Sequence, residues 1–254
     1  MVLRKVSALL VGGALLAGAL ANAQTEAEID QAIQGFNRGK TFHQERRYED
    51  AVREYRKAVK LDPENPFIFN AMGLALASLG SFRESLESFN RALTINPDLT
   101  DVYNNIGMVY AESGERDKAF EAFGRAVRNP NYLTPEKALY NIGSLYFEDG
   151  NYELALTFFK RSVEKKPEFV LGYRGLGKVM LAVDDIEGAE IEFKKALDLF
   201  DADLESLFQL ARIHQQRGDA EQASALYRRV VEVDRLSTYG QLAREQLEAL
   251  KSGS

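Results

Sequence analysis

The side chains that most often ligate metals are rare in this chain of 254 residues, which has no cysteine and two histidines, His43 and His214. Transition-metal sites in proteins require several nitrogen or sulfur ligands in one place. The two histidines lie near opposite ends of the sequence, and neither has a cysteine to join it. We interpret each as a solvated or packing residue and expect no metal site. The lack of cysteine also excludes a disulfide.

Carboxylates are abundant, with 38 Asp and Glu residues, and a pair of them would be the natural candidate for general acid–base chemistry. Such a pair works when an apolar pocket raises one pKa, whereas these residues fall mostly on predicted solvated helix faces. The glycine motifs of dinucleotide sites and serine hydrolases are absent after residue 23, and Gly175-Leu176-Gly177 lacks a third glycine at the required spacing. The sequence therefore predicts a protein that is not an enzyme and holds no cofactor.

A strict internal period shows how the chain positions its side chains. In rows of 34 residues, with steps of 34, 34, 36, 34 and 34, small residues stack in one column and aromatic residues in another. The small column holds Gly39, Gly73, Gly107, Gly143, Gly177 and Ala211, and the aromatic column holds Tyr55, Phe89, Phe123, Phe159, Phe193 and Tyr227. Small residues let neighbouring helices approach closely, and we expect this packing to bury the aromatic column.

Each row has the pattern of two helices joined by a turn. In the second row, apolar residues follow a helical stripe on both sides of Gly80, at Phe69, Met72, Gly73 and Leu76 and then at Phe82, Leu86, Phe89 and Leu93. Gly114, Gly150 and Gly218 hold the equivalent turn position in other rows. A residue that tolerates positive φ ends the first helix there.

These columns resemble the tetratricopeptide repeat, a 34-residue helix pair with a glycine in its first helix and an alanine, an aromatic residue and an alanine in its second. The resemblance covers residues 32–237 and implies an all-α, right-handed superhelical solenoid of six helix pairs with a C-terminal capping helix. The expected organisation is a signal peptide at 1–23, a lead-in at 24–31, repeats at 32–65, 66–99, 100–135, 136–169, 170–203 and 204–237, and a capping helix and tail at 238–254.

The resemblance implies a groove lined by the second, fifth, ninth and twelfth positions of each row. In rows one to four this lining is apolar with amide rungs, at Phe36, Phe67, Leu74, Met108, Tyr140 and Phe147 with Asn70 and Asn104. It suits an amphipathic helix or an extended apolar peptide, and packing of some residues against adjacent helices is the alternative. Rows five and six place Arg174, Lys178 and Arg212 there, either to receive a carboxylate or as a solvated basic patch.

The charge balance bears on the partner. With 38 acidic and 32 basic residues the net charge is −6, whereas a groove for nucleic acid shows as a clustered basic surface. We therefore expect a protein or peptide partner, no nucleic acid and no small-molecule substrate.

The first 23 residues differ in kind from the rest. Arg4 and Lys5 precede an apolar run that ends in Ala21-Asn22-Ala23, which is typical of a secretory signal peptide. An uncleaved membrane anchor is the alternative, although the apolar run is shorter than the roughly 20 residues of a spanning helix. We expect an exported, periplasmic protein.

The six rows, the export signal and the linker before row four resemble the PilF/PilW-type biogenesis proteins of type IV pili. The matching residues are Asn129, Pro130, Tyr132 and Pro135 with Asn141 and Gly143. The resemblance implies a pilotin, which helps the outer-membrane secretin to assemble. Such proteins are typically lipoproteins, whereas Ala19 stands where the lipidated cysteine would be. A general envelope adaptor or co-chaperone that binds a peptide or helix of an assembly or export complex is the alternative.

Overall fold

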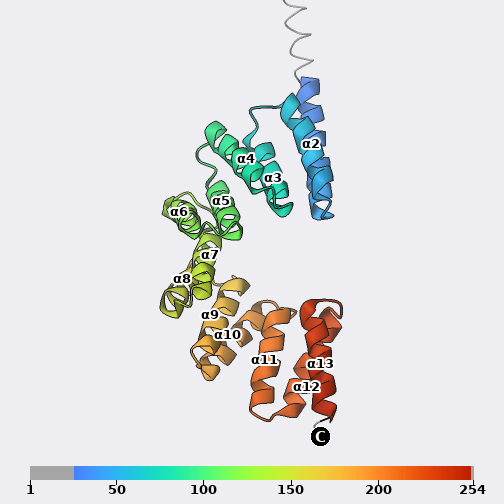
Figure 1. The fold of residues 1–254 in the computed structure, drawn as a ribbon, viewed down its shortest axis with the longest axis vertical. Coiled ribbons are helices and arrows are strands. Elements are labelled where there is room, and N and C mark those ends of the chain that lie inside the picture. The colour runs from blue at the N-terminus through green and yellow to red at the C-terminus, as the bar shows by residue number, and fades with distance from the viewer. Residues whose placement is uncertain (1–25, 253–254) are drawn as a thin grey trace, which may run out of the picture. The chain divides into compact units, whose positions relative to one another are not determined.

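The computed structural model describes residues 26–252, so the predicted signal peptide lies outside the described residues. Every regular element in this range is an α-helix, and no strand occurs in it. Residues 26–44 form the first helix. The others are α2 (Tyr48–Leu61), α3 (Pro66–Ser78), α4 (Phe82–Ile95), α5 (Thr100–Glu112), α6 (Arg116–Arg128), α7 (Pro135–Glu148), α8 (Tyr152–Lys165), α9 (Val170–Ala182), α10 (Ile186–Leu199), α11 (Leu204–Gln216), α12 (Ala220–Val233) and α13 (Thr238–Ser252) (Figure 1).

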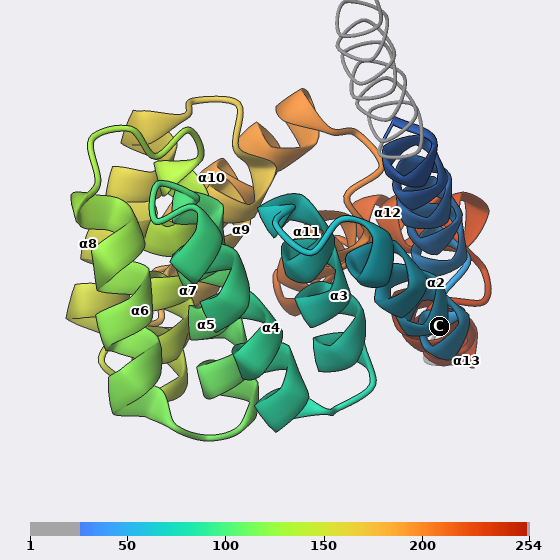
Figure 2. The same ribbon diagram turned by 90° about the horizontal axis from the view of Figure 1, so that it is seen from above.

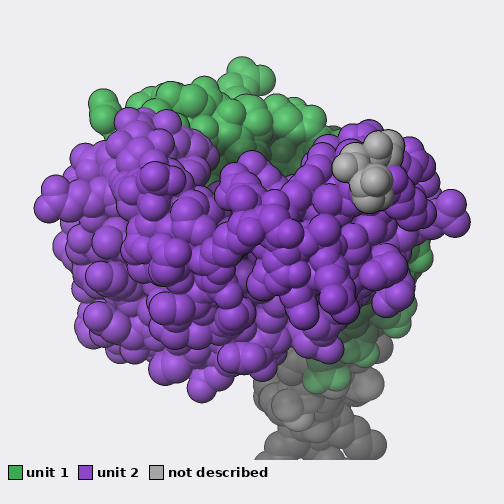
Figure 3. All heavy atoms as spheres, turned by 90° about the horizontal axis from the view of Figure 1, so that it is seen from below, with its two compact units in different colours: residues 1–119 green, residues 120–254 purple. Residues whose placement is uncertain are grey.

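The helices group into two compact units, which are coloured separately in Figure 3. Unit 1 comprises residues 1–119 and unit 2 residues 120–254, with the division inside α6. Within each unit, consecutive helices pack as antiparallel pairs, such as α3 with α4 and α9 with α10 (Figure 2). The predicted all-α class built of helix pairs is therefore confirmed. No helix among residues 26–252 combines the length and the apolar character needed to cross a bilayer.

The starts and ends of the helices follow from local chemistry. The Asn65 side chain accepts a hydrogen bond from the Phe67 N–H at 3.1 Å, and Pro66 opens α3, as expected of a cap and a first-turn proline. Gly80 ends this helix with a φ of +71°. Gly114, Gly150 and Gly218 also have positive φ, so the predicted role of the turn glycines is confirmed.

Two rows place a residue other than glycine at this turn. Arg46 has a φ of 59° and Asp184 a φ of 62°. A side chain in this left-handed region costs about 1–2 kcal/mol. Arg46 belongs to unit 1 and Asp184 to unit 2, so each unit contains one strained turn.

The small and aromatic columns meet as predicted. A Cβ atom added to Gly73 would lie 2.6 Å from the Phe89 ring, and one added to Gly143 would lie 2.8 Å from the Phe159 ring. The Ser85 hydroxyl fastens the same helix pair by donating to the Gly73 carbonyl at 2.8 Å. The whole aromatic column is at most 3% exposed, at Tyr55, Phe89, Phe123, Phe159, Phe193 and Tyr227. Burial of such rings is the largest apolar contribution to each row.

The helical residues at both ends extend the repeat pattern. Residues 26–31, expected to form a lead-in, belong to the first helix, because nothing in this Glu- and Ala-containing stretch breaks a helix. At the other end, α13 packs against α12 and α11. Its Ala243 is fully buried and Tyr239 and Leu247 pack beside it, which is the arrangement expected of a capping helix.

The linker before α7 contains the two extra residues that break the 34-residue period. The Asn129 side chain accepts from the Asn131 N–H at 2.9 Å, and the Tyr132 N–H donates to the Asn129 carbonyl at 3.1 Å. This turn directs Tyr132 inward, where it is 6% exposed, while Leu133 is 87% exposed. Tyr132 is therefore packed into the protein, whereas Leu133 stays accessible on its surface.

Candidate partner-binding surface

The predicted groove residues all lie on the first helix of a pair. Phe36 lies on the helix of residues 26–44, Phe67, Asn70 and Leu74 on α3, Asn104 and Met108 on α5, Tyr140 and Phe147 on α7, Arg174 and Lys178 on α9, and Arg212 on α11.

In unit 1, α3 presents one face that is open to solvent. Phe67, Asn70 and Leu74 lie three and four positions apart, so they share that face. The Phe67 side chain is 56% exposed, while Asn70 and Leu74 are half-buried. An exposed phenylalanine beside a half-buried leucine is apolar surface that no other described part of the chain covers.

The neighbouring helix α5 continues this face. Met108 is 42% exposed, whereas Asn104 is 7% exposed and its Nδ2 atom lies 3.7 Å from the Met108 sulfur. Asn105 donates to the Asn70 Oδ1 atom at 3.0 Å. The side-chain amide hydrogen bond between the two rows thus joins Asn70 and Asn105, whereas the sequence prediction named the adjacent residue, Asn104. The doublet Asn104-Asn105 was the available signal, because either residue could have faced Asn70.

Phe36 is the predicted groove residue of unit 1 that packs into the core. Its ring centroid lies 5.9 Å from that of Tyr55, and it joins the cluster around Ala51 and Tyr55. The Lys40 ammonium lies 5.6 Å from the Phe36 ring centroid on the same helix. Phe36 therefore fits the packing alternative for this residue.

In unit 2, the two predicted aromatic residues are covered by other side chains. Tyr140 packs against Phe159 and Phe169, with ring centroids 5.4 and 5.8 Å apart. Phe147 packs against Tyr152 at 5.6 Å. Both are half-buried, so they add less open apolar surface than Phe67 and Met108 do in unit 1.

The basic residues of α9 are paired with carboxylates of the same chain. The Arg174 guanidinium lies 3.0 Å from Asp203 Oδ1 and 3.1 Å from Glu205 Oε2, and the Lys178 ammonium lies 3.4 Å from Glu205 Oε1. Burial alone would lower the pKa of Arg174, but the charges of Asp203 and Glu205 outweigh it, so the pKa of Arg174 is raised. The reception of a partner's carboxylate here stays a prediction, and such a carboxylate would compete with Glu205.

Aromatic side chains border this charged cluster. The Lys178 ammonium lies 5.5 Å from the Phe147 ring centroid, so α7 and α9 present their predicted residues to the same place. From α13, Tyr239 reaches Glu205. Burial is the larger cause and the charge of Glu205 the smaller one, and together they raise the pKa of Tyr239 to about 12. Asp203, Glu205 and Tyr239 are absent from the predicted site, although the acidic Glu205 occupies the second position of row six, next to the basic positions of row five.

Arg212 is the predicted basic residue that stays in solvent. Its Nη1 atom lies 3.2 Å from the Gln209 amide oxygen. It borders one pocket of about 390 Å³ with Leu181 and Ile186, and another of about 360 Å³ with Phe208 and Gln246. Both pockets lie within unit 2 and are lined partly by glutamine side chains.

The histidines remain apart from any metal-binding arrangement. His43 packs edge-on against Tyr48 with ring centroids 5.3 Å apart, and burial lowers the pKa of His43. The His214 Nδ1 atom lies 3.3 Å from Asp219 Oδ2. Within residues 26–252, no group of three or more His, Cys, Asp or Glu side chains is placed to hold a metal ion.

Sequence comparison matches the chain to tetratricopeptide repeats. A profile described as "TPR repeat" matches residues 39–80 and 73–114, and profiles described as "Tetratricopeptide repeat" match residues 100–129, 136–169 and 204–235. The protein CTR9 homolog of Arabidopsis thaliana is 28% identical over 105 residues, which is 40% of this chain and 10% of that protein. The chain thus spans about a tenth of that relative's length.

Solved structures show the same fold. PilW, described as a type IV pilus biogenesis factor, has a TM-score of 0.69 and 23% identity, with 83% of this chain and 97% of PilW covered. Pseudomonas aeruginosa PilF has a TM-score of 0.68 and 15% identity, with 87% of this chain and 99% of PilF covered. YrrB, described as a repeat protein with an unusual peptide-binding site, has a TM-score of 0.50 and 16% identity, with 75% of this chain and 97% of YrrB covered.

Proposed function

From the premise that the chain belongs to the tetratricopeptide repeat family, we propose that it is a non-catalytic scaffold that binds a protein or peptide partner through the face of unit 1 that α3 and α5 form. This face, called the apolar groove below, comprises Phe67, Asn70, Leu74, Asn105 and Met108. Helix-pair repeats carry extended binding surfaces of this kind.

The exposure of Phe67 and Met108 is the observation that carries the proposal. These two side chains are 56% and 42% exposed on neighbouring first helices, and the Asn70–Asn105 hydrogen bond joins their helices between them. Burying such apolar surface against a partner contributes about 25 cal/mol per Å². An amphipathic helix or an extended apolar segment has the complementary chemistry.

We propose further that the partner is an outer-membrane secretin and that the protein assists type IV pilus biogenesis in the periplasm as a pilotin. Support comes from the fold shared with PilW and PilF along nearly their whole length and from the linker residues around Pro130. Export by residues 1–23 would place the protein in that compartment. Ala19 stands where such proteins carry the lipidated cysteine, so the proposal includes no lipid at that position.

The general envelope adaptor is the second candidate function, and the likeness to YrrB, described as having a peptide-binding site, favours it. It would use the same apolar groove with a different peptide. The two candidates differ only in the partner, so one capture experiment separates them.

The test is affinity capture from crosslinked cell envelopes with the wild-type chain and with a Phe67→Glu/Met108→Glu variant. Both residues are exposed, so the variant keeps its helical circular dichroism. A matched control, Ile191→Glu/Leu199→Glu, places the same charges on exposed apolar residues of α10 in unit 2, which are 54% and 42% exposed.

Secretin recovered by the wild type and the control but lost with the groove variant supports the proposal. Another envelope protein recovered in the same pattern moves the function to the general adaptor. Equal recovery of secretin by all three proteins would refute the assignment of the groove.

A further inference from the structure

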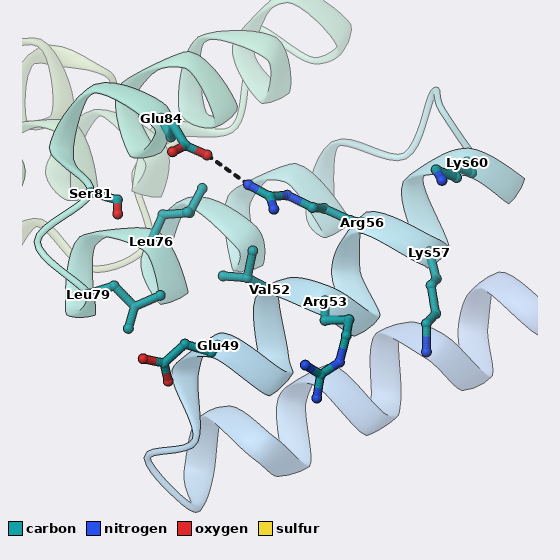
Figure 4. A pocket seen from close by; sticks show the side chains of 10 residues that line it. All are labelled: Glu49, Val52, Arg53, Arg56, Lys57, Lys60, Leu76, Leu79, Ser81 and Glu84. Atoms are coloured by element: carbon teal, nitrogen blue, oxygen red, sulfur yellow. Dashed lines mark hydrogen bonds and ion pairs between the residues drawn. The ribbon is translucent and has the colours of Figure 1, made fainter.

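Unit 1 contains a pocket that none of the predicted groove residues lines. It is a pocket of about 540 Å³ between α2 and the connected helices α3 and α4, lined by Glu49, Val52, Arg53, Arg56, Lys57, Lys60, Leu76, Leu79, Ser81 and Glu84 (Figure 4). A smaller pocket of about 240 Å³ adjoins it, since both include Arg56, Leu76 and Glu84. The two adjoining pockets together are called the basic channel below.

The floor of the basic channel is apolar and one wall is cationic. Val52 and Leu76, 5% and 4% exposed, form the floor with the half-buried Leu79. The wall is a run of cations along α2, at Arg53, Arg56, Lys57 and Lys60, and Figure 4 shows them along this helix. Over both pockets the lining holds these four cations and Arg91, against the three carboxylates Glu49, Glu84 and Glu87. In a chain with a net charge of −6, this is a local excess of positive charge.

The ion pairs at this wall leave cations available to a partner. Arg56 reaches across the channel to Glu84 at 2.8 Å, with side chains 58% and 47% exposed, as the dashed line in Figure 4 marks, so this pair is weak. Arg53 pairs with Asp50 and Lys57 with Glu54, and these two carboxylate side chains are 23% and 8% exposed. Asp50 also pairs with Arg47 and Glu54 with Arg38, so a partner's carboxylate can draw Arg53 away without leaving Asp50 unpaired. Lys60 has no carboxylate partner among the described residues.

We propose that the basic channel binds an acidic amphipathic helix of a partner protein. Leucine-like side chains on one face of that helix would fill the apolar floor, and carboxylates beside them would pair with Arg53 and Lys60. A pocket of about 540 Å³ with an adjoining one of about 240 Å³ has room for several side chains of such a segment, which is more than a small anion fills. The proposal goes beyond the apolar groove and gives unit 1 two distinct surfaces, so the protein can hold two partners at once.

The test uses the full chain and a synthetic, fluorescently labelled peptide of about four helical turns, with leucine every third or fourth position and glutamate elsewhere. A second peptide carries lysine in place of glutamate. The channel variant is Arg53→Glu/Lys60→Glu. The matched control, Lys160→Glu/Lys165→Glu, makes the same charge change on exposed residues of α8 in unit 2 and includes its last-turn lysine, as Lys60 is in α2.

We expect fluorescence anisotropy to show binding of the glutamate peptide, a loss of affinity of about tenfold or more in the channel variant, and less than a twofold change in the control. Glu84→Gln removes the competing carboxylate and should tighten binding about twofold to threefold. Phe67→Glu/Met108→Glu should leave this affinity unchanged, which keeps this test separate from that of the apolar groove.

Three results would overturn the proposal. The first is equal binding of the lysine peptide. The second is binding of phosphatidylglycerol vesicles, lost in the channel variant, without binding of the glutamate peptide, because it would assign the channel to an anionic membrane surface. The third is a peptide-free dimer in sedimentation that the channel variant dissociates, because it would assign the channel to a second copy of the chain.

Discussion

Equivalent positions on the first helices of the pairs differ between the two units in whether their side chains are open to a partner. In unit 1, Phe67 and Met108 stay exposed beside one amide hydrogen bond. In unit 2, Arg174 and Lys178 are paired with Asp203 and Glu205, and the aromatic residues Tyr140 and Phe147 pack against other rings. The repeat places a side chain on this face, but the neighbouring row decides whether it is available to a partner.

The caps of the second and sixth rows offer the largest contrast in stability. Asn65 caps α3 through one hydrogen bond to Phe67, whereas Asp203 accepts from the Ser206 N–H at 3.1 Å and also from Arg174. We expect Asp203→Ala to lower the free energy of unfolding by about 2–3 kcal/mol, since it removes a cap and leaves Arg174 with one carboxylate fewer. Asn65→Ala should cost about 1 kcal/mol.

Urea unfolding followed by circular dichroism measures both variants. Asp203→Asn, which keeps an acceptor for the helix N-terminus and removes the charge, separates the capping share from the ion-pair share. Equal losses for Asn65→Ala and Asp203→Ala would contradict the view that unit 2 depends on its charged network.

The salt dependence of partner binding distinguishes the apolar groove of unit 1 from the basic residues of unit 2. Association through the apolar groove of unit 1 should weaken less than twofold when salt is raised from about 0.1 to 0.5 M, because screening acts on exposed charges and not on apolar contact. Association through Arg174, Lys178 and Arg212 should weaken severalfold. Titrating the captured partner at both salt concentrations tests this, and a steep loss of affinity would exclude the apolar groove as the main contact.

The pKa values of one buried tyrosine in each unit offer a further comparison, in which a smaller effect is expected. Burial raises the pKa of Tyr55 in unit 1 to about 12, and burial together with the charge of Glu205 raises the pKa of Tyr239 in unit 2 to about 12. In each case the protonated, buried tyrosine contributes fully to the free energy of unfolding below the unfolded pKa of about 10. This contribution is lost as the pH rises through 12.

Glu205→Gln should therefore lower the pKa of Tyr239 and leave that of Tyr55 unchanged, because only Tyr239 has this carboxylate beside it. Ultraviolet titration of tyrosinate, as a difference against Tyr239→Phe in the same background, measures the change. An unaltered Tyr239 pKa in Glu205→Gln would show that the carboxylate does not bear on the ring.

The smallest expected effect concerns the strained turns, one in each unit. Arg46→Gly should stabilise the chain by about 0.5–1 kcal/mol, since glycine adopts its φ without a steric cost. Asp184→Gly should stabilise it by less, because aspartate tolerates the left-handed region better than arginine does. Thermal unfolding of both variants checks the order, and destabilisation by Arg46→Gly would show that the Arg46 side chain has a contact of its own.

Much of the fold follows from the spacing of residue types, because the repeat is local. The aromatic column could be assigned to the core since a ring such as Phe89 needs a small residue such as Gly73 opposite it, and both recur at a fixed offset. Gly80 could be assigned to a turn for the same reason. The division of the chain inside α6 had no such signal, since the period continues through it.

The candidate site was harder to predict because it depends on contacts between rows. Asn104 and Asn105 are one residue apart, which is a rotation of about 100° on a helix, and only the packing of α5 on α3 selects Asn105 for Asn70. Glu205 could be aligned with the groove, but its pairing with Arg174 depends on the stacking of two rows. Tyr132 turns inward because of backbone hydrogen bonds at Asn129 that its sequence position does not reveal.

Hydrogen–deuterium exchange of the chain with and without a purified secretin tests most directly that unit 1 presents the open surface and unit 2 a closed one. The account predicts slower exchange in α3 and α5 when the partner is bound, which the Phe67→Glu/Met108→Glu variant abolishes. Protection confined to α9 and α11, unaffected by that variant, would contradict it.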